Sequence, residues 1–321
     1  MARSAPDSSG SNDTLSRALE GLRRELRQRL EDAGAAASRS VTSDDLFELF
    51  NRLRKAANSF GMRDRSVEVD EFGLDPAAVE RSRPLLDFLC ERWWRVEVEG
   101  LEQLDPEEPA LLVANHSGLL PYDGLVLAHV IERAIGRRPR FLVADWLVTL
   151  PFAQPRLARL GGVRACRENA QRLLRAGHSV IAFPEGAKGA TKVFADRYRV
   201  QRFGRGGVVR VALEERVPLV PVSVVGAEEA HPILFKLRTM ARSVGLPFVP
   251  VTPTFPWLGP AGLLPLPSKW RIRIGAPMPT DGVGAESADD EVLISRMTED
   301  LRQRIQSMLD EDRRARAGVF S

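Results

Sequence analysis

Hydrophobic and polar positions follow two different periods along the chain. Near the N-terminus, leucines recur at helical spacing among many Arg and Glu residues, at Leu15, Leu19, Leu22, Leu26 and Leu30. This pattern predicts an amphipathic helix, and a second one is expected over residues 44–58. We expect both helices to pack on a partner helix, since their apolar stripes are narrow and poor in aromatic residues. Docking on a membrane is the alternative for the same two helices.

Beyond about residue 75, short apolar strands alternate with helices. The runs 140–144, 179–183 and 219–225 are rich in Val and Ile, as buried parallel strands are. Further strands are expected at 95–99, 110–114 and 270–274, and helices at 124–135, 168–176 and 207–215. The alternation predicts an α/β fold with a largely parallel or mixed central sheet flanked by helices.

The chain divides into two predicted parts. Residues 1–74 form an N-terminal extension that is partly disordered and partly helical, because 1–14 and 34–44 are rich in Ser, Ala, Gly and Asp. Residues 75–321 form the main domain, which ends in a C-terminal helix. The start of this domain is a helix with an apolar face that includes Leu89, Trp93 and Trp94.

One segment of the main domain, residues 244–267, breaks the alternation. It carries no charged residue, and its many prolines exclude a helix or a central strand. The same interruptions exclude a membrane-spanning helix. Two interpretations remain open: an irregular cover over the core, or an apolar surface for acyl chains or lipid.

The composition of the chain says more about its cellular compartment than about its function. The net charge of +3 does not by itself indicate nucleic acid, and we expect none as a partner. Residues 199–275 nevertheless hold eleven Lys or Arg against four Glu. Such an excess suits a surface facing phospholipid headgroups, a phosphorylated substrate or coenzyme A, although scattered solvated charge is an equal alternative.

Targeting features are absent from the pattern. The two cysteines have no CxxC spacing, which fits a reducing compartment. The first ten residues are polar, and no run of about 18 apolar residues occurs. We therefore expect a cytoplasmic protein that is soluble or lies on the inner face of the cell membrane.

The first candidate for chemistry is His116, in the segment Asn115-His116-Ser117-Gly118 directly after the strand 110–114. Ligands of open α/β sheets bind beyond the carboxyl ends of strands. An imidazole there can take a proton from a hydroxyl near neutral pH. Asp123 can orient the ring through a hydrogen bond, or it can cap the helix that follows.

The second candidate is Phe-Pro-Glu-Gly-Ala-Lys-Gly, again after an apolar strand, with Glu185, Gly186 and Lys188. Its glycines allow backbone N–H groups to face a phosphate, and Lys188 or Lys192 can add positive charge. A simple turn at the end of a strand is the structural alternative.

A third candidate is Arg167, at the start of the helix after Gly161-Gly162. An arginine at a helix start can hold a phosphate in a bidentate manner. Without further context, a solvated surface residue is the favoured interpretation. The remaining histidines have no metal-ligand spacing, so we predict no metal site.

Taken in order, these blocks and the run Val217-Pro218-Leu219-Val220-Pro221-Val222 resemble the glycerophospholipid acyltransferase superfamily. The similarity extends from about residue 96 to 277 and is greatest for its diacylglycerol acyltransferase-like branch. The resemblance implies that His116 and Asp123 are the catalytic pair. It assigns substrate binding to Asn115, Ser117, Arg167, Glu185, Gly186, Lys188 and Pro221.

The spacing of the first block departs from the superfamily. Four residues usually separate the His and the Asp, whereas six separate His116 from Asp123, and Pro121 stands at the usual Asp position. Either the loop bulges and still delivers Asp123 to His116, or Asp123 only caps the helix. Catalytic loops tolerate insertions when their ends are fixed, which favours the bulge.

The resemblance implies direct acyl transfer. His116 would deprotonate a hydroxyl of a lysophospholipid or glycerolipid, which attacks the thioester of acyl-CoA or acyl carrier protein. No cofactor is expected beyond that co-substrate. The membrane surface and the lipid acceptor are the expected partners. The alternatives are an acyltransferase for neutral mono- or diacylglycerol and a lipid-binding peripheral protein without turnover.

Overall fold

The computed structural model describes residues 42, 44–49, 51–53, 69–118, 120–148, 153–237, 248–280, 285–316 and 318–319. The expected helix at 15–30 and the polar segments 1–14 and 34–44 lie outside these residues, apart from positions 42 and 44. Residues 44–49 and 51–53 are helical, as predicted. Leu49 of this helix is fully buried in the main core.

Within the described residues, seven strands form the central sheet, in the order β1-β9-β6-β2-β5-β3-β4. All neighbouring pairs are parallel except β6 and β9. The predicted mixed α/β fold is therefore confirmed. The strands are β1 (Glu97–Glu99), β2 (Leu111–Ala114), β3 (Arg140–Val143), β4 (Gly162–Arg164), β5 (Val180–Ala182), β6 (Leu219–Val225) and β9 (Arg271–Ile274).

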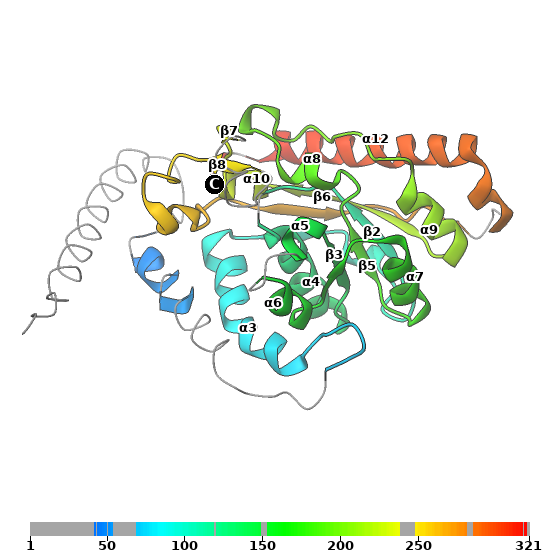
Figure 1. Cartoon of the computed structure of the whole chain (residues 1–321), viewed down its shortest axis with the longest axis horizontal. Helices are drawn as coiled ribbons and strands as arrows, with labels where there is room; N and C mark the ends of the chain where they lie inside the picture. Colours follow the sequence, from blue (N-terminus) through cyan, green and yellow to red (C-terminus); the bar gives the residue numbers. More distant parts are fainter. Residues whose placement is uncertain are drawn as a thin grey trace, which may run out of the picture.

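Both faces of the sheet are covered by helices (Figure 1). Alternate residues of β2 divide between the two cores: Leu112 and Ala114 belong to one, Leu111 and Val113 to the other. This burial on both sides explains why the strand is apolar throughout. One face carries α3 (Pro76–Phe88) and α4 (Tyr122–Ile135), and the other carries α7 (Arg167–Arg175), α9 (Gly207–Glu215) and α12 (Glu291–Ala315).

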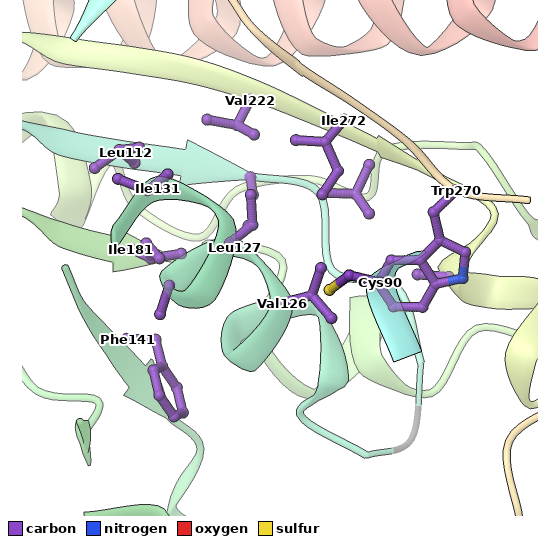
Figure 2. Packing of buried hydrophobic residues seen from close by; sticks show 14 of the residues in the cluster. Cys90, Leu112, Val126, Leu127, Ile131, Phe141, Ile181, Val222, Trp270 and Ile272 are labelled. Carbon is purple, nitrogen blue, oxygen red and sulfur yellow. The ribbon is translucent and has the colours of Figure 1, made fainter. Parts of the chain in front are cut away.

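The core on the α4 face connects helix and sheet directly (Figure 2). Val126, Leu127 and Ile131 lie about one turn apart on α4, so they face the sheet together. Their core cluster includes the sheet side chains Leu112, Ile181, Val222 and Ile272. This packing fixes α4, and with it the loop that joins β2 to α4.

The uncharged segment forms part of a small second sheet, which the pattern did not predict. β7 (Phe235–Leu237) and β8 (Val249–Val251) pair as antiparallel strands, followed by the 3₁₀ helix η4 (Gly259–Leu263). The inner side is attached to the core, because the indole N–H of Trp93 donates to the Pro265 carbonyl at 3.1 Å. The inner side of the segment thus covers the core, as one interpretation held, and its outer side leaves the lipid-surface interpretation open.

The remaining helices are short. They comprise α5 (Asp145–Val148), α6 (Ala153–Arg159), α8 (Gly186–Ala190) and α10 (Ala227–Ala230), together with the π-helical turn η1 (Leu89–Trp93) and the 3₁₀ turns η2 (Leu101–Gln103), η3 (Phe194–Asp196) and η5 (Ala285–Asp289). Among the helices that the structure describes, none is long and apolar enough to cross a bilayer.

Candidate active site

The loop after β2 is held at the carboxyl edge of the sheet by Asn115. Its side-chain amide donates to the Val224 carbonyl at 3.0 Å, and its carbonyl oxygen accepts from the Val224 N–H at 2.7 Å. Because Asn115 is fully buried, this pairing extends the contact between β2 and β6 by one residue. Asn115 therefore positions the loop through the backbone of β6.

His116 and Asp123 are brought together despite the six intervening residues. The Nδ1 atom of His116 lies 2.7 Å from Oδ2 of Asp123. The same oxygen accepts from the Ser117 N–H at 3.1 Å, and Oδ1 accepts from the Gly124 N–H at 2.8 Å. A carboxylate on Nδ1 holds the ring proton there, which leaves the lone pair of the neutral imidazole on Nε2.

The geometry of α4 corrects the role of Asp123 as a helix cap. The helix begins at Tyr122, two residues earlier than predicted, and its N-cap position is Pro121. Asp123 thus lies in the first turn, where a carboxylate is also favoured by the helix dipole. Of the two alternatives, the bulged loop describes the structure.

The ring of His116 lies between the interior and the surface. It stacks on Phe183 with ring centroids 4.6 Å apart, and 14% of its side chain is exposed. Phe183 directly follows β5, so two neighbouring parallel strands orient the same imidazole. The Ser117 hydroxyl next to it is buried and has no hydrogen-bond partner within the described residues.

Glu185 is bound internally rather than open to a ligand. Its Oε1 accepts from the His116 N–H and its Oε2 from the Gln201 N–H, both at 2.7 Å. The side chain is fully buried. Glu185 therefore ties the loop after β2 to the loop before α9, and the adjacent Gly186 begins α8 with a φ of +57°.

Lys192, not Lys188, is the lysine that enters the site. Its ammonium lies 3.3 Å from Glu185 and 2.7 Å from Glu228, and only 5% of the side chain is exposed. Burial alone would lower the pKa of Lys192, but the two carboxylates outweigh it and raise the pKa. Lys192 is therefore held charged, whereas Lys188 is exposed on α8.

Gly189 was missed as a site residue. A Cβ atom at this position would lie 2.5 Å from Cβ of Glu185 and 2.9 Å from Cβ of His116. Both separations are far below van der Waals contact, so α8 can approach the histidine loop only with glycine there. The spacing Gly-x-x-Gly in the segment Phe-Pro-Glu-Gly-Ala-Lys-Gly was the signal for it.

Arg167 and Pro221 lie away from the imidazole. β4, which leads to Arg167, is the third strand from β2, a separation of roughly 14 Å at ~4.8 Å per strand. Arg167 forms an ion pair with Glu214 of α9. Pro221 is inside β6 and in register with Val113, one residue before the end of β2.

His231 was set aside at the level of sequence, yet it connects the site to the uncharged segment. Its ring stacks on Tyr122 at 5.7 Å, and its Nε2 donates to the Leu263 carbonyl at 2.8 Å. Burial lowers the pKa of His231, so it remains a neutral donor. Nothing in its sequence neighbourhood identified Tyr122 as a partner.

This arrangement suits proton transfer at a hydroxyl. A neutral imidazole oriented by a carboxylate can accept a proton at Nε2 and return it to a leaving group. In the ranges that the structure covers, no three His, Cys, Asp or Glu side chains converge on a possible metal position. The fold and the dyad define an α/β protein with a histidine–aspartate pair at the carboxyl end of a central strand.

Comparisons with known proteins identify the family. The family model named Acyltransferase matches residues 95–225, which include the dyad and the loop with Glu185. "Uncharacterized protein ML2427" of Mycobacterium leprae is 43% identical over 302 residues, covering 92% of this chain and 82% of the relative. The chain belongs to the acyltransferase family and is an enzyme of lipid metabolism that transfers acyl groups.

Two more distant relatives are named for lipid synthesis. The human "DGAT1/2-independent enzyme synthesizing storage lipids" is 23% identical over 232 residues, covering 71% of this chain and 65% of the relative. The 1-acyl-sn-glycerophosphate acyltransferase PlsC of Thermotoga maritima has a TM-score of 0.45 and 20% identity, with 85% of this chain and 90% of that chain covered.

Proposed function

We propose that the enzyme moves a fatty acyl group from acyl-CoA or acyl carrier protein to a hydroxyl of a lysophospholipid or glycerolipid. The observation that carries this proposal is the 2.7 Å contact between His116 and Asp123 at the carboxyl end of β2. It lies inside the segment matched by the acyltransferase family. The proposed place of action is the inner face of the cell membrane.

The proposed reaction needs no covalent acyl-enzyme. Nε2 of His116 accepts the proton of the acceptor hydroxyl while the oxygen attacks the thioester carbonyl. The carbon–sulfur bond then breaks, and the imidazolium returns the proton to the departing thiolate. Asp123 stabilises the imidazolium between these steps, and general base catalysis of this kind contributes ~10²–10⁴-fold to a rate.

The other side chains divide into positioning and contact roles. Asn115 and Glu185 fix the loop through backbone groups, so we assign them to positioning. Ser117 and Gly186 stand next to these groups and remain candidates for contact with the acceptor. Lys188 is exposed on α8 and remains a candidate for the phosphates of the acyl donor.

A neutral acceptor is the second candidate function, and it rests on a specific observation. Arg167, expected to hold a phosphate, is paired with Glu214, and Glu185, expected to bind substrate, is engaged with backbone N–H groups. A monoacylglycerol or diacylglycerol has no phosphate and needs neither. The printed name of the human relative, which refers to storage lipids, accords with this candidate.

A panel of acceptors tests the proposal. The purified enzyme is given isotope-labelled acyl-CoA or acyl carrier protein with lysophosphatidate, monoacylglycerol, diacylglycerol or water alone, and products are measured by mass spectrometry. The proposal expects labelled lipid ester to form faster than free fatty acid. Preference for lysophosphatidate or for the neutral glycerides decides between the two candidates. Thioester hydrolysis alone, or lipid binding without any transfer, would contradict both.

A further inference from the structure

Large apolar side chains are exposed in one region more than elsewhere. Six of the ten exposed large hydrophobic residues in the described part of the chain belong to β7, the residue before it, the turn after β8 and the 3₁₀ helix η4. We call these six the apolar rim: Leu234, Phe235, Leu237, Trp257, Leu258 and Leu263. Trp257 is 77% exposed and Phe235 68%, so the two aromatic residues protrude most.

We propose that the apolar rim docks the enzyme onto the surface of a phospholipid bilayer, next to the catalytic loop. This inference rests on the proposed function, because the acceptor lipid would be taken from that bilayer. The rim lies at one end of the molecule, where the hairpin and the turn after it extend beyond the sheet (Figure 1). An exposed apolar patch of this kind marks a site of interaction.

The composition of the rim favours a bilayer over a protein partner. Residues 248–267 contain no charged side chain, so this part can enter the headgroup region without the cost of burying a charge. Tryptophan, which is both apolar and able to donate a hydrogen bond, concentrates at the boundary between headgroups and acyl chains. Trp257 occupies the most exposed position of the rim.

Cationic side chains next to the rim complement an anionic headgroup layer. Lys236 lies within β7 and donates to the Thr191 hydroxyl at 3.2 Å, which joins the hairpin to the end of α8. Lys188 of that helix is exposed, and so is Arg199 just beyond η3. Basic residues near an anionic membrane are attracted to its headgroups.

Contacts connect the rim to the catalytic loop. Leu263 of the rim accepts a hydrogen bond from His231, whose ring stacks on Tyr122 at the start of α4. Ile233, just before the rim, lines a small hollow together with Gly118 and Gly189. A bilayer on the rim would thus lie beside the loop that holds His116, where a lipid hydroxyl is needed.

Binding to vesicles tests the proposal. The full chain is mixed with phosphatidylcholine vesicles, with and without phosphatidylglycerol, and the bound fraction is measured by flotation. Phe235→Glu combined with Trp257→Glu should lower the partition coefficient at least ~10-fold, because two aromatic side chains no longer enter the interface. Val292→Glu is the matched control, since Val292 is 80% exposed on α12 and should leave binding unchanged.

Tryptophan fluorescence provides an independent measurement. Vesicles made with brominated phospholipid should quench part of the emission of the wild-type protein, and Trp257→Phe should remove that quenching while retaining vesicle binding. Trp93, Trp94 and Trp270 are buried and serve as the internal reference, and Trp146, the fifth tryptophan, is replaced by Phe in both proteins. Quenching that persists unchanged in Trp257→Phe would overturn the assignment of the surface.

Other outcomes separate this proposal from the proposed function. Equal vesicle binding by the double variant, or none by the wild type, would overturn docking through the rim. So would a wild-type dimer that binds no vesicles and that the double variant converts to monomers. Transfer to a short-chain acceptor dispersed in water measures the chemistry alone, so its absence counts against the proposed function and not against docking.

Discussion

His116 combines a fixed ring with an accessible nitrogen. Asp123 engages Nδ1, and Phe183 packs against the ring, so the orientation of Nε2 is determined before any substrate binds. Preorganisation of this kind reduces the entropy lost in reaching the transition state. At this scale the role of each neighbour can be tested by removing one hydrogen-bonding feature at a time.

Replacing Asp123 with Asn should lower kcat by ~10²–10⁴-fold with little change in KM, since the amide keeps the size but no longer stabilises the imidazolium. Steady-state kinetics and a urea unfolding curve measure the two effects separately. Asp145→Asn is the matched control, because Asp145 is an exposed carboxylate paired with Arg164 on the surface. A kcat within twofold of the wild type in a folded Asp123→Asn protein would contradict the dyad.

At the scale of elements, the site depends on how closely α8 approaches the loop after β2. Glu185 before the helix binds the His116 N–H, and Gly189 within the helix leaves room for both side chains. Lys192, just after the helix, neutralises Glu185 from the other side. The short helix α8 therefore sets the position of the backbone that carries the His116 imidazole.

Gly189→Ala should displace α8 from the histidine loop. The added methyl group would overlap the Cβ atoms of Glu185 and His116, at a cost of about 1–3 kcal/mol in unfolding free energy and a loss of activity. Unfolding in urea and kcat measure both. Gly207→Ala is the control, because no atom lies within 4 Å of its new Cβ, and alanine suits the first turn of α9. Equal behaviour of the two variants would refute the packing role of Gly189.

The sequence pattern predicted the bounds of the main helices and strands well and the contacts between them poorly. β6 and α9 have the expected bounds, β2 and β3 differ from the expected runs by one residue at one end, and β5 differs by one residue at each end. These elements could be predicted because burial in the core alone is enough to give them apolar patterns. β4, β7 and β8 were not predicted: each has three residues, and Gly162, Lys236 and Pro250 interrupt their apolar runs.

The same limit applies to the site. The loop ends that bear His116 and Glu185 could be predicted because each follows an apolar strand. The contact of Glu185 with the Gln201 N–H could not, since it joins loops 16 residues apart that share no periodic pattern. The expected phosphate role of Arg167 overlooked Glu214, which α9 brings alongside α7. Tertiary packing decides such pairings.

For the whole molecule, the parallel strands deliver the residues of the candidate site to one edge. β2 leads to His116 and β5 to Glu185, while α4 returns Asp123 to the same loop. Ligands of open α/β sheets bind at this edge, where neighbouring loops diverge. The uncharged segment reaches the same region through His231 and Leu263. The fold therefore joins a candidate base to a candidate lipid surface.

The most direct test of this account is acyl transfer by a folded His116→Ala protein. Wild type and variant are compared in a single turnover with labelled acyl donor and the best acceptor, after unfolding curves show equal stability. The account predicts that the rate falls by ~10²–10⁴-fold while binding of the acyl donor is retained, since the imidazole acts only on the proton of the acceptor. Transfer at the wild-type rate would contradict it.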